Sequence, residues 1–189
     1  MSTWAIIAVR AFEHGKSRLA PIMSPAERAA YARGLFEGVL AAAQQCAAIE
    51  HILVATDASD LSPSGCLVLA DAAHASLAMV VDAALEHARG RGAGRAIVLM
   101  SDLPLITPND IADLDAFAAS HPLVVVPDTS ERGTNALAIS LPARYSTCFG
   151  NADSFDRHRA LEGCAVYRNP RIARDVDTPD DYRAVSTAL

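Results

Sequence analysis

The chain has 189 residues, of which 51% are hydrophobic and 20% charged, and its mean hydropathy is +0.19. A chain of this length and composition can bury a sizeable core, which excludes a disordered or low-complexity protein. Its 16 basic and 22 acidic residues give a net charge of −6. Proteins that bind nucleic acid phosphates usually carry a basic excess, so we expect no nucleic acid partner.

The cysteines and the N-terminus predict a soluble, cytoplasmic protein. Cys46, Cys66, Cys148 and Cys164 lie far apart and form no Cys-x-x-Cys pair. We therefore expect four small, buried hydrophobic side chains in a reducing compartment, rather than disulfides or a zinc site. No apolar run approaches the length of a membrane span, and no basic segment precedes the first apolar run, so we expect no membrane partner.

Short apolar runs alternate with helix-length segments along the first two thirds of the chain. The helix starts are marked by a hydroxyl residue, a proline and an acid three residues after the hydroxyl, a combination that satisfies free backbone N–H groups. The runs lack polar alternation, which predicts strands buried on both faces of a largely parallel sheet. The expected strands are residues 4–9, 51–55, 66–70, 96–100 and 123–126, and the expected helices are residues 25–46, 77–89 and 108–119.

This alternation predicts an α/β fold with a doubly wound, mostly parallel sheet and helices on both faces. After residue 128 the rhythm changes: a strand at 136–141, a short helix at 154–162, and one or two strands within 165–176. We expect this part to add a mixed or antiparallel edge. No repeat, Gly/Ser linker or charge block divides the chain, so residues 1–189 are predicted to form a single domain.

Acidic residues follow most of the predicted strands. In a doubly wound sheet, ligands bind beyond the carboxyl ends of the strands, so these acids should gather at one edge. Some of them will only cap helices or tighten turns. Their concentration nevertheless predicts a metal-dependent site there, and the acids are Asp57, Asp71, Asp102, Asp128 and Asp177.

Two cations follow the first predicted strand. The segment Gly15-Lys16-Ser17 is half of a phosphate-binding P-loop motif, but Arg10 stands where that motif needs glycine, and no dinucleotide-binding glycine pattern is present. Lys16 and Arg18 could together clamp a triphosphate, since arginine offers a fixed fork and lysine a mobile charge. The alternative is a solvated basic loop.

Three carboxylates are candidates for binding Mg²⁺, which prefers oxygen ligands. Asp102 lies at the carboxyl end of a predicted strand, and the alternative is that it caps a turn before Pro104. Asp175 and Asp177 would share one face of the last strand, where two like charges need a neutralising cation. The alternative there is that Asp177 caps the following helix while Asp175 is solvated.

Small polar residues and glycines form a third candidate group. In the turn Arg132-Gly133-Thr134-Asn135, the glycine allows close approach of a ligand, while Thr134 and Asn135 supply hydrogen bonds. Gly150 and Ser154 could hold an anion before a short helix, although a plain helix cap explains them as well. His158, inside that helix, is expected to be an ordinary exposed or buried histidine.

In this order, the segments resemble the phospholactate or phosphoenolpyruvate guanylyltransferases of deazaflavin coenzyme F-420 biosynthesis, a branch of the molybdenum-cofactor guanylyltransferase-like nucleotidyltransferases. The likeness spans residues 6–182. Its segments are Lys16-Ser17-Arg18-Leu19-Ala20-Pro21 with Ser24-Pro25-Ala26-Glu27-Arg28, Asp102-Leu103-Pro104-Leu105, Gly133-Thr134-Asn135-Ala136-Leu137, Ser154-Phe155 with His158, and Asp175-Val176-Asp177-Thr178-Pro179.

The resemblance implies a fold like that of nucleotide-diphospho-sugar transferases, and a Mg²⁺-dependent transfer of GMP from GTP to a phosphorylated three-carbon acid with release of pyrophosphate. The acid would be 2-phospholactate, phosphoenolpyruvate or 3-phosphoglycerate. The resemblance also implies roles: Lys16 and Arg18 hold the triphosphate, Asp102, Asp175 and Asp177 hold Mg²⁺, and Thr134, Gly150 and Ser154 bind the acid. A homodimer is compatible with the resemblance.

The chain departs from the family pattern in several places, and two of the departures lie in segments expected near the substrates. Val80-Val81-Asp82 stands where a Gly-Leu-Asn segment is usual, and the loop from Gly150 to Ser154 is one residue longer than the pattern. Two alternatives therefore stay open: a related nucleotidyltransferase with another nucleotide or phosphorylated acceptor, and a nucleotide-binding protein that has lost turnover.

Overall fold

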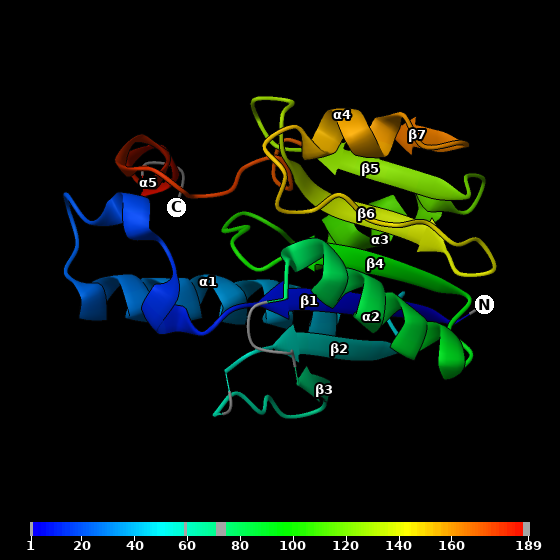
Figure 1. The fold of residues 1–189 in the computed structure, drawn as a ribbon, viewed down its shortest axis with the longest axis horizontal. Coiled ribbons are helices and arrows are strands. Elements are labelled where there is room, and N and C mark those ends of the chain that lie inside the picture. Colours follow the sequence, from blue (N-terminus) through cyan, green and yellow to red (C-terminus); the bar gives the residue numbers. More distant parts are fainter. Residues whose placement is uncertain (1, 59, 71–74, 187–189) are drawn as a thin grey trace.

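The computed structural model describes residues 2–58, 60–70 and 75–186, so Asp71 lies outside the described residues. Seven strands form one mixed sheet in the order β3-β2-β1-β4-β6-β5-β7 (Figure 1). The strands are β1 (Thr3–Val9), β2 (His51–Thr56), β3 (Leu67–Ala70), β4 (Arg95–Met100), β5 (Leu123–Pro127), β6 (Thr134–Ser140) and β7 (Cys164–Val166).

Helices cover both faces of this sheet, which confirms the predicted fold class. Two apolar clusters lie on opposite sides of β1: Ala5, Ile7 and Val9 pack with α1 and α3, while Trp4, Ile6 and Ala8 pack with α2 and α4. The helices are α1 (Pro25–Gln45), α2 (Leu77–Gly90), α3 (Pro108–Ala118), α4 (Ser154–Arg159) and α5 (Pro179–Ser186), and two short 3-10 helices, η1 (Phe12–His14) and η2 (Ser17–Leu19), follow β1.

The predicted helix starts are confirmed. Ser24 and Glu27 form a reciprocal capping box at the start of α1, and Thr107 with Asp110 does the same for α3. At α5, the Thr178 hydroxyl accepts from the backbone N–H of Asp181, whose carboxylate accepts from Thr178 in return. Thr178 is therefore the cap of α5, so the carboxylate of Asp177 is left for other contacts.

One expectation about the sheet is wrong. Strand β3 is predicted to be buried on both faces, but Leu67 and Val68 are 37% and 40% exposed because β3 is an edge strand. The mixed edge predicted after residue 128 is confirmed, and its antiparallel strand, β6, lies between β4 and β5. The edge beyond β5 is the parallel strand β7.

The last part of the chain is also less regular than predicted. Of the segment 165–176, only its first two residues belong to a strand, the three-residue β7. The rest runs as turns and extended chain toward α5. Thr134 and Asn135, predicted in a turn, are the first two residues of β6. All four cysteines are free, but the prediction that they are buried is confirmed only for Cys46, since the other three are partly exposed.

Candidate functional site

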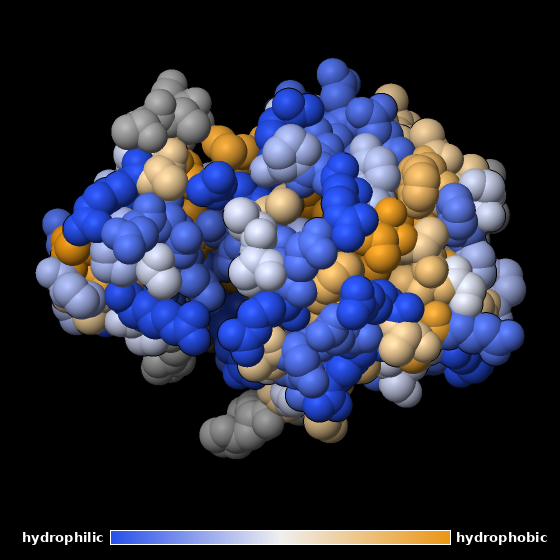
Figure 2. Space-filling model, turned by 90° about the horizontal axis from the view of Figure 1, so that it is seen from above, coloured by the Kyte–Doolittle hydropathy of each residue, from blue (hydrophilic) through white to orange (hydrophobic). Residues whose placement is uncertain are grey.

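Two cavities lie side by side beyond the carboxyl ends of β1 and β4. The larger, about 530 Å³, extends over the start of β6 and the loop before α4, and the smaller, about 220 Å³, lies against the end of β1. Asp102 and Asp177 line both cavities. In Figure 2, hydrophilic side chains border the hollow between the part of the molecule that carries α5 and the body of the sheet.

The acidic residues predicted to bind metal meet where the two cavities join. Carboxylate oxygens of Asp102, Asp175 and Asp177 all lie within 4.8 Å of one another. Asp175 and Asp177 are predicted to meet because they share one face of a strand, but residues 174–177 belong to no strand. Asp102 follows β4, and the other two are carried by the extended segment that leads into α5.

Asp175 is the most strongly perturbed of these acids. Burial raises its pKa to about 6, and the nearby Asp102 carboxylate adds to the rise, while a hydrogen bond from Asn135 opposes it. A buried carboxylate beside other carboxylates favours a cation that would neutralise their charge. Three carboxylate oxygens are also the type of ligand that Mg²⁺ and Mn²⁺ prefer.

Lys16 is the cation that the structure places in this cluster. It is the only lysine in the chain, and its Nζ donates to Asp102 at 2.5 Å and to Asp177 at 3.1 Å. Burial acts to lower its pKa, but the two carboxylates outweigh burial and raise it. Its φ of 54° is a left-handed conformation that is rare for lysine, and it places the ammonium between these two acids.

The two cations of the predicted clamp contribute to different cavities. Lys16 lines the smaller cavity and is nearly buried, with 9% of its side chain exposed. Arg18 lines the larger cavity, is 73% exposed, and lies 3.6 Å from Asp177. Their side chains nevertheless meet at one carboxylate, because Asp177 lies 3.1 Å from the Lys16 ammonium and 3.6 Å from the Arg18 guanidinium.

The four residues predicted to bind substrate all line the larger cavity. Thr134 and Ser154 are buried, and Gly150 has a φ of 82°, a conformation that favours glycine. Asn135 is also buried, but its amide nitrogen donates to the carbonyl oxygens of Ile172 and Ala173 and, at 3.4 Å, to Asp175. We expect Asn135 to position the segment that carries Asp175.

A second anchor of that segment was missed by the sequence reasoning. The carboxylate of Asp110, on α3, is fully buried and accepts hydrogen bonds from Arg171 and Asn169. The Asn169 side chain in turn accepts from the backbone N–H groups of Arg171 and Ile172. The only sequence signal was the capping position of Asp110, which explains a helix start but not a contact about 60 residues away.

Other acids at this edge tighten loops, as the sequence allowed. Asp57 accepts from the backbone N–H of Ala11 at 2.6 Å and so holds the chain just after β1. Asp128 accepts from the backbone N–H of Arg132 and the hydroxyl of Ser130. A Cβ on Gly133 would lie 2.9 Å from an Asp128 oxygen, so a larger residue there would displace this carboxylate.

The departure at Val80-Val81-Asp82 has a structural explanation. Val80 and Val81 are buried between α2 and the sheet, where they contribute to the core. Asp82 accepts a hydrogen bond of 3.0 Å from the backbone N–H of Thr147 and thereby holds the loop that leads to Gly150. The aspartate is therefore engaged with the protein itself on the side of the larger cavity.

Comparison with known proteins identifies the family. Residues 3–185 match the family model described as "Guanylyl transferase CofC like". The chain belongs to this CofC-like guanylyl transferase family. It is 36% identical to a phosphoenolpyruvate guanylyltransferase of Conexibacter woesei, over 98% of this chain and 87% of that protein. It is 34% identical to a 2-phospho-L-lactate guanylyltransferase of Halorubrum lacusprofundi, over 89% and 77%.

Solved structures support the fold of this CofC-like chain. A Desulfovibrio desulfuricans G20 protein, whose structure was solved under the description of a nucleotide-diphospho-sugar transferase, superposes on this chain with a TM-score of 0.78 at 17% identity. The superposition covers 98% of this chain and 87% of that one. A Mycobacterium tuberculosis H37Rv protein solved as a complex with manganese superposes with a TM-score of 0.61 at 16% identity, over the full length of both chains. Among the described residues, no helix has the length and apolar character needed to cross a bilayer.

Proposed function

We propose that this protein transfers the guanylyl group of GTP to the phosphate of a small phosphorylated three-carbon acid and releases pyrophosphate. The observation that carries the proposal is that two cavities of different size share Asp102 and Asp177. The triphosphate end of a nucleotide beside Lys16 and an acceptor in the larger cavity would meet at these carboxylates. The names of the relatives, which act with phosphoenolpyruvate and 2-phospho-L-lactate, fit the same pair of substrates.

Asp102, Asp175 and Asp177 would hold Mg²⁺, since their oxygens are close together and of the preferred type. When bound, the ion would neutralise negative charge on the phosphates of the nucleotide and the acceptor. Lys16, between Asp102 and Asp177, would place its ammonium beside the triphosphate. Arg18, on the larger cavity, would face the acceptor and the reacting phosphate.

The reaction needs no general base from the protein. An oxygen of the acceptor phosphate, which is largely a dianion at neutral pH, forms a bond to the α-phosphorus of GTP. The bond from that phosphorus to the oxygen bridging to the β-phosphate breaks, and its electron pair leaves with pyrophosphate. The chain's contribution is therefore to position both substrates and to stabilise charge.

On the acceptor side, Thr134, Gly150 and Ser154 would bind the acid. Thr134 and Ser154, which carry hydroxyl groups, line the larger cavity, and Gly150 allows the backbone to approach a ligand closely. We also propose a cytoplasmic location, because all four cysteines are free, as is usual in a reducing compartment.

The proposal is tested by measuring pyrophosphate release with GTP and Mg²⁺ against phosphoenolpyruvate, 2-phospholactate and 3-phosphoglycerate in parallel. We expect release with at least one acid, and mass spectrometry should identify a product heavier than the acid by one guanylyl group. ATP, CTP and UTP serve as controls for the base. Binding of GTP without release in any well would support the alternative of a nucleotide-binding protein, and release with another nucleotide would replace guanine in the proposal.

A further inference from the structure

His158 connects the two parts of the larger cavity that the acid would contact. It lies on α4, is fully buried, and makes two hydrogen bonds outside its helix. Its Nδ1 is 2.9 Å from the hydroxyl oxygen of Thr134 on β6. Its Nε2 is 2.7 Å from the backbone nitrogen of Cys148, in the loop before α4.

These contacts determine the position of the imidazole proton. The backbone N–H of Cys148 can only donate, so Nε2 must be the unprotonated, accepting nitrogen. In a neutral imidazole the other nitrogen then carries the proton, and Nδ1–H donates to the Thr134 oxygen. Burial lowers the pKa of His158 to about 4, against a smaller opposing effect of a backbone hydrogen bond with Ser154, so the ring is neutral at pH 7.

The direction of this hydrogen bond determines what Thr134 can do. Because its oxygen accepts from His158, the Thr134 hydroxyl proton is free to donate elsewhere. Within the described residues, no carbonyl or carboxylate accepts from this hydroxyl, and Thr134 lines the larger cavity. The hydroxyl is therefore prepared to donate to an anion in the cavity, with little reorganisation on binding.

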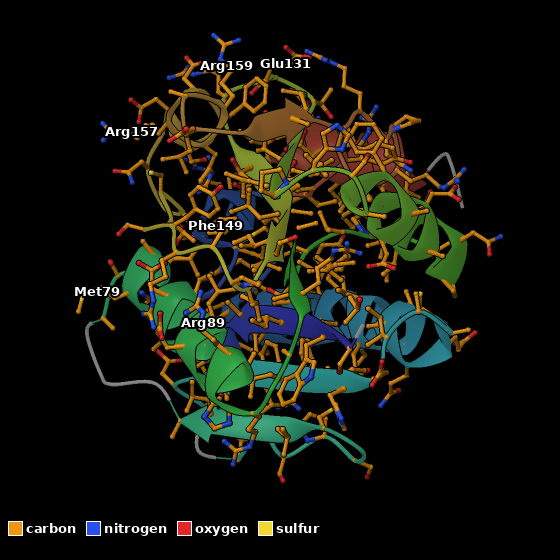
Figure 3. All side chains as sticks on the ribbon, turned by 90° about the vertical axis from the view of Figure 1, so that its right-hand side faces the viewer. Met79, Arg89, Glu131, Phe149, Arg157 and Arg159 are labelled. Carbon is orange, nitrogen blue, oxygen red and sulfur yellow. The ribbon has the colours of Figure 1, made fainter. Side chains whose placement is uncertain are left out.

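The surroundings of His158 keep the ring in this orientation. The ring of Phe149 packs edge-on against it, with centroids 5.0 Å apart. In Figure 3, Phe149 points into the molecule, whereas Arg157 and Arg159, the neighbours of His158 on α4, point outward. The outward arginines are paired with Asp153 and Asp156, so neither of them competes with the His158 Nδ1–H for the Thr134 oxygen.

We propose that His158 is a positioning residue for the acceptor: through its Nδ1–H it turns the Thr134 hydroxyl into a donor for an anionic oxygen of the phosphorylated acid. This inference rests on the proposed function. His158 does not touch the substrate, and its nitrogen Nε2 also fixes the loop that carries Gly150. The two contacts can be separated by substitution.

Two isosteric variants divide the contacts of the ring. The amide of His158→Asn reaches the position of Nδ1 and can still donate to Thr134, whereas the amide oxygen of His158→Gln reaches the position of Nε2 and can still accept from Cys148. We expect His158→Gln to raise the acceptor KM roughly three- to tenfold, the effect of one hydrogen bond, with the KM of GTP unchanged. His158→Asn should raise the acceptor KM less, and His87→Gln, on α2, is a matched control.

A double-mutant comparison shows whether His158 acts through Thr134. In a Thr134→Val background, His158→Gln should raise the acceptor KM no further. In a Thr134→Ser background, which keeps the hydroxyl, His158→Gln should raise the acceptor KM by the same factor as in the wild type. An equal rise in all backgrounds, a parallel rise in both KM values, or no rise would overturn the proposal.

A measurement without turnover keeps this inference separate from the proposed function. Long-range ¹H–¹⁵N NMR spectra of the whole protein at pH 7 report which imidazole nitrogen of His158 carries the proton. We expect the Nδ1–H form, and the Nε2–H form would overturn the inference whatever the activity. A wild-type protein inactive with every acid, but with the Nδ1–H form, would contradict the proposed function and leave the hydrogen-bond direction confirmed.

Discussion

The two cavities share an acidic wall, yet their other walls are built differently. Around the larger cavity, Thr134, Asn135 and Ser154 are each at most 5% exposed, and neutral hydrogen bonds to His158 and to residues 172–173 hold the first two. Around the smaller cavity, the side chain of Arg10 is 51% exposed, and Lys16 is held by ion pairs.

The two kinds of wall are expected to respond differently to the binding of a charged ligand. Neutral hydrogen bonds between buried groups change little with local charge, so the larger cavity is organised before binding. The Lys16 ion pairs depend on the charges around them, and a cation or a triphosphate at the acidic cluster would compete for the same partners. The hydrogen-bonded wall of the larger cavity therefore suits selection of one acid, whereas the Lys16 ion pairs can rearrange when the phosphates of the nucleotide bind.

The largest expected effect follows from the wall that both cavities share. Asp102→Asn removes one charge from the cluster that would hold the metal and should lower turnover roughly a thousandfold, the upper end of the range for losing one group that stabilises transition-state charge. Pyrophosphate release measures the loss. Asp113→Asn, on the exposed face of α3, is the control and should behave as the wild type. Near-normal turnover of Asp102→Asn would contradict the proposed role of Asp102 in binding the metal.

The next effect should separate the nucleotide side from the acceptor side. Lys16→Met removes the ammonium beside the shared carboxylates and should lower kcat/KM for GTP roughly a hundredfold, with a much smaller change in the acceptor KM. Steady-state rates with each substrate varied in turn distinguish the two constants. Lys16→Arg, which keeps the charge, should recover part of the loss. If the acceptor KM rises as much as that of GTP, the division between the cavities is wrong.

A third prediction concerns the anchor of the acceptor side. Burial acts to raise the pKa of Asp110, but hydrogen bonds from Arg171, Thr107 and Asn169 outweigh it and lower the pKa to about 2. Because the folded pKa lies below the unfolded value near 3.9, this group stabilises the fold above pH 4, and the contribution is lost as pH falls toward 2.

The expected loss is about 2 kcal/mol in the free energy of unfolding, since each pKa unit corresponds to about 1.4 kcal/mol. Urea unfolding between pH 5 and 2.5 measures it. Asp110→Asn should be less stable than the wild type at pH 5 and should show a weaker dependence on pH over this range. An unchanged pH dependence would show that the pKa of Asp110 is not lowered in the folded protein.

The sheet and the acidic cluster could be predicted from the sequence because both follow from local patterns. Apolar runs, capping boxes and the rule that ligands bind beyond the carboxyl ends of strands predicted most strands and helices, and they placed Asp102 near Asp177. The errors lie where tertiary position decides: β3 reads as a buried strand but lies at the edge, and residues 174–177 converge on Asp102 without belonging to a strand.

The network that supports the larger cavity left no local pattern. Thr134 and His158 are 24 residues apart, and Asp110 and Arg171 are 61 apart, so neither pair shares a helix face or a strand. Each residue has an ordinary local explanation: Asp110 caps a helix, and His158 occurs within one. Lys16 did carry a signal that spacing alone missed, because it is the only lysine among 16 basic residues.

The smallest expected effect comes from Arg18, and it tests the division between the cavities from the other side. Its guanidinium is 73% exposed and 3.6 Å from Asp177, a geometry in which an ion pair contributes little. Arg18→Met should raise the acceptor KM only two- to fivefold, leave the KM of GTP unchanged, and lose its effect at high salt, which screens exposed charges. Steady-state rates at low and high salt measure this. A change in the KM of GTP as large as that of Lys16→Met would show that the two cations act together on the triphosphate, as their spacing in the sequence suggested.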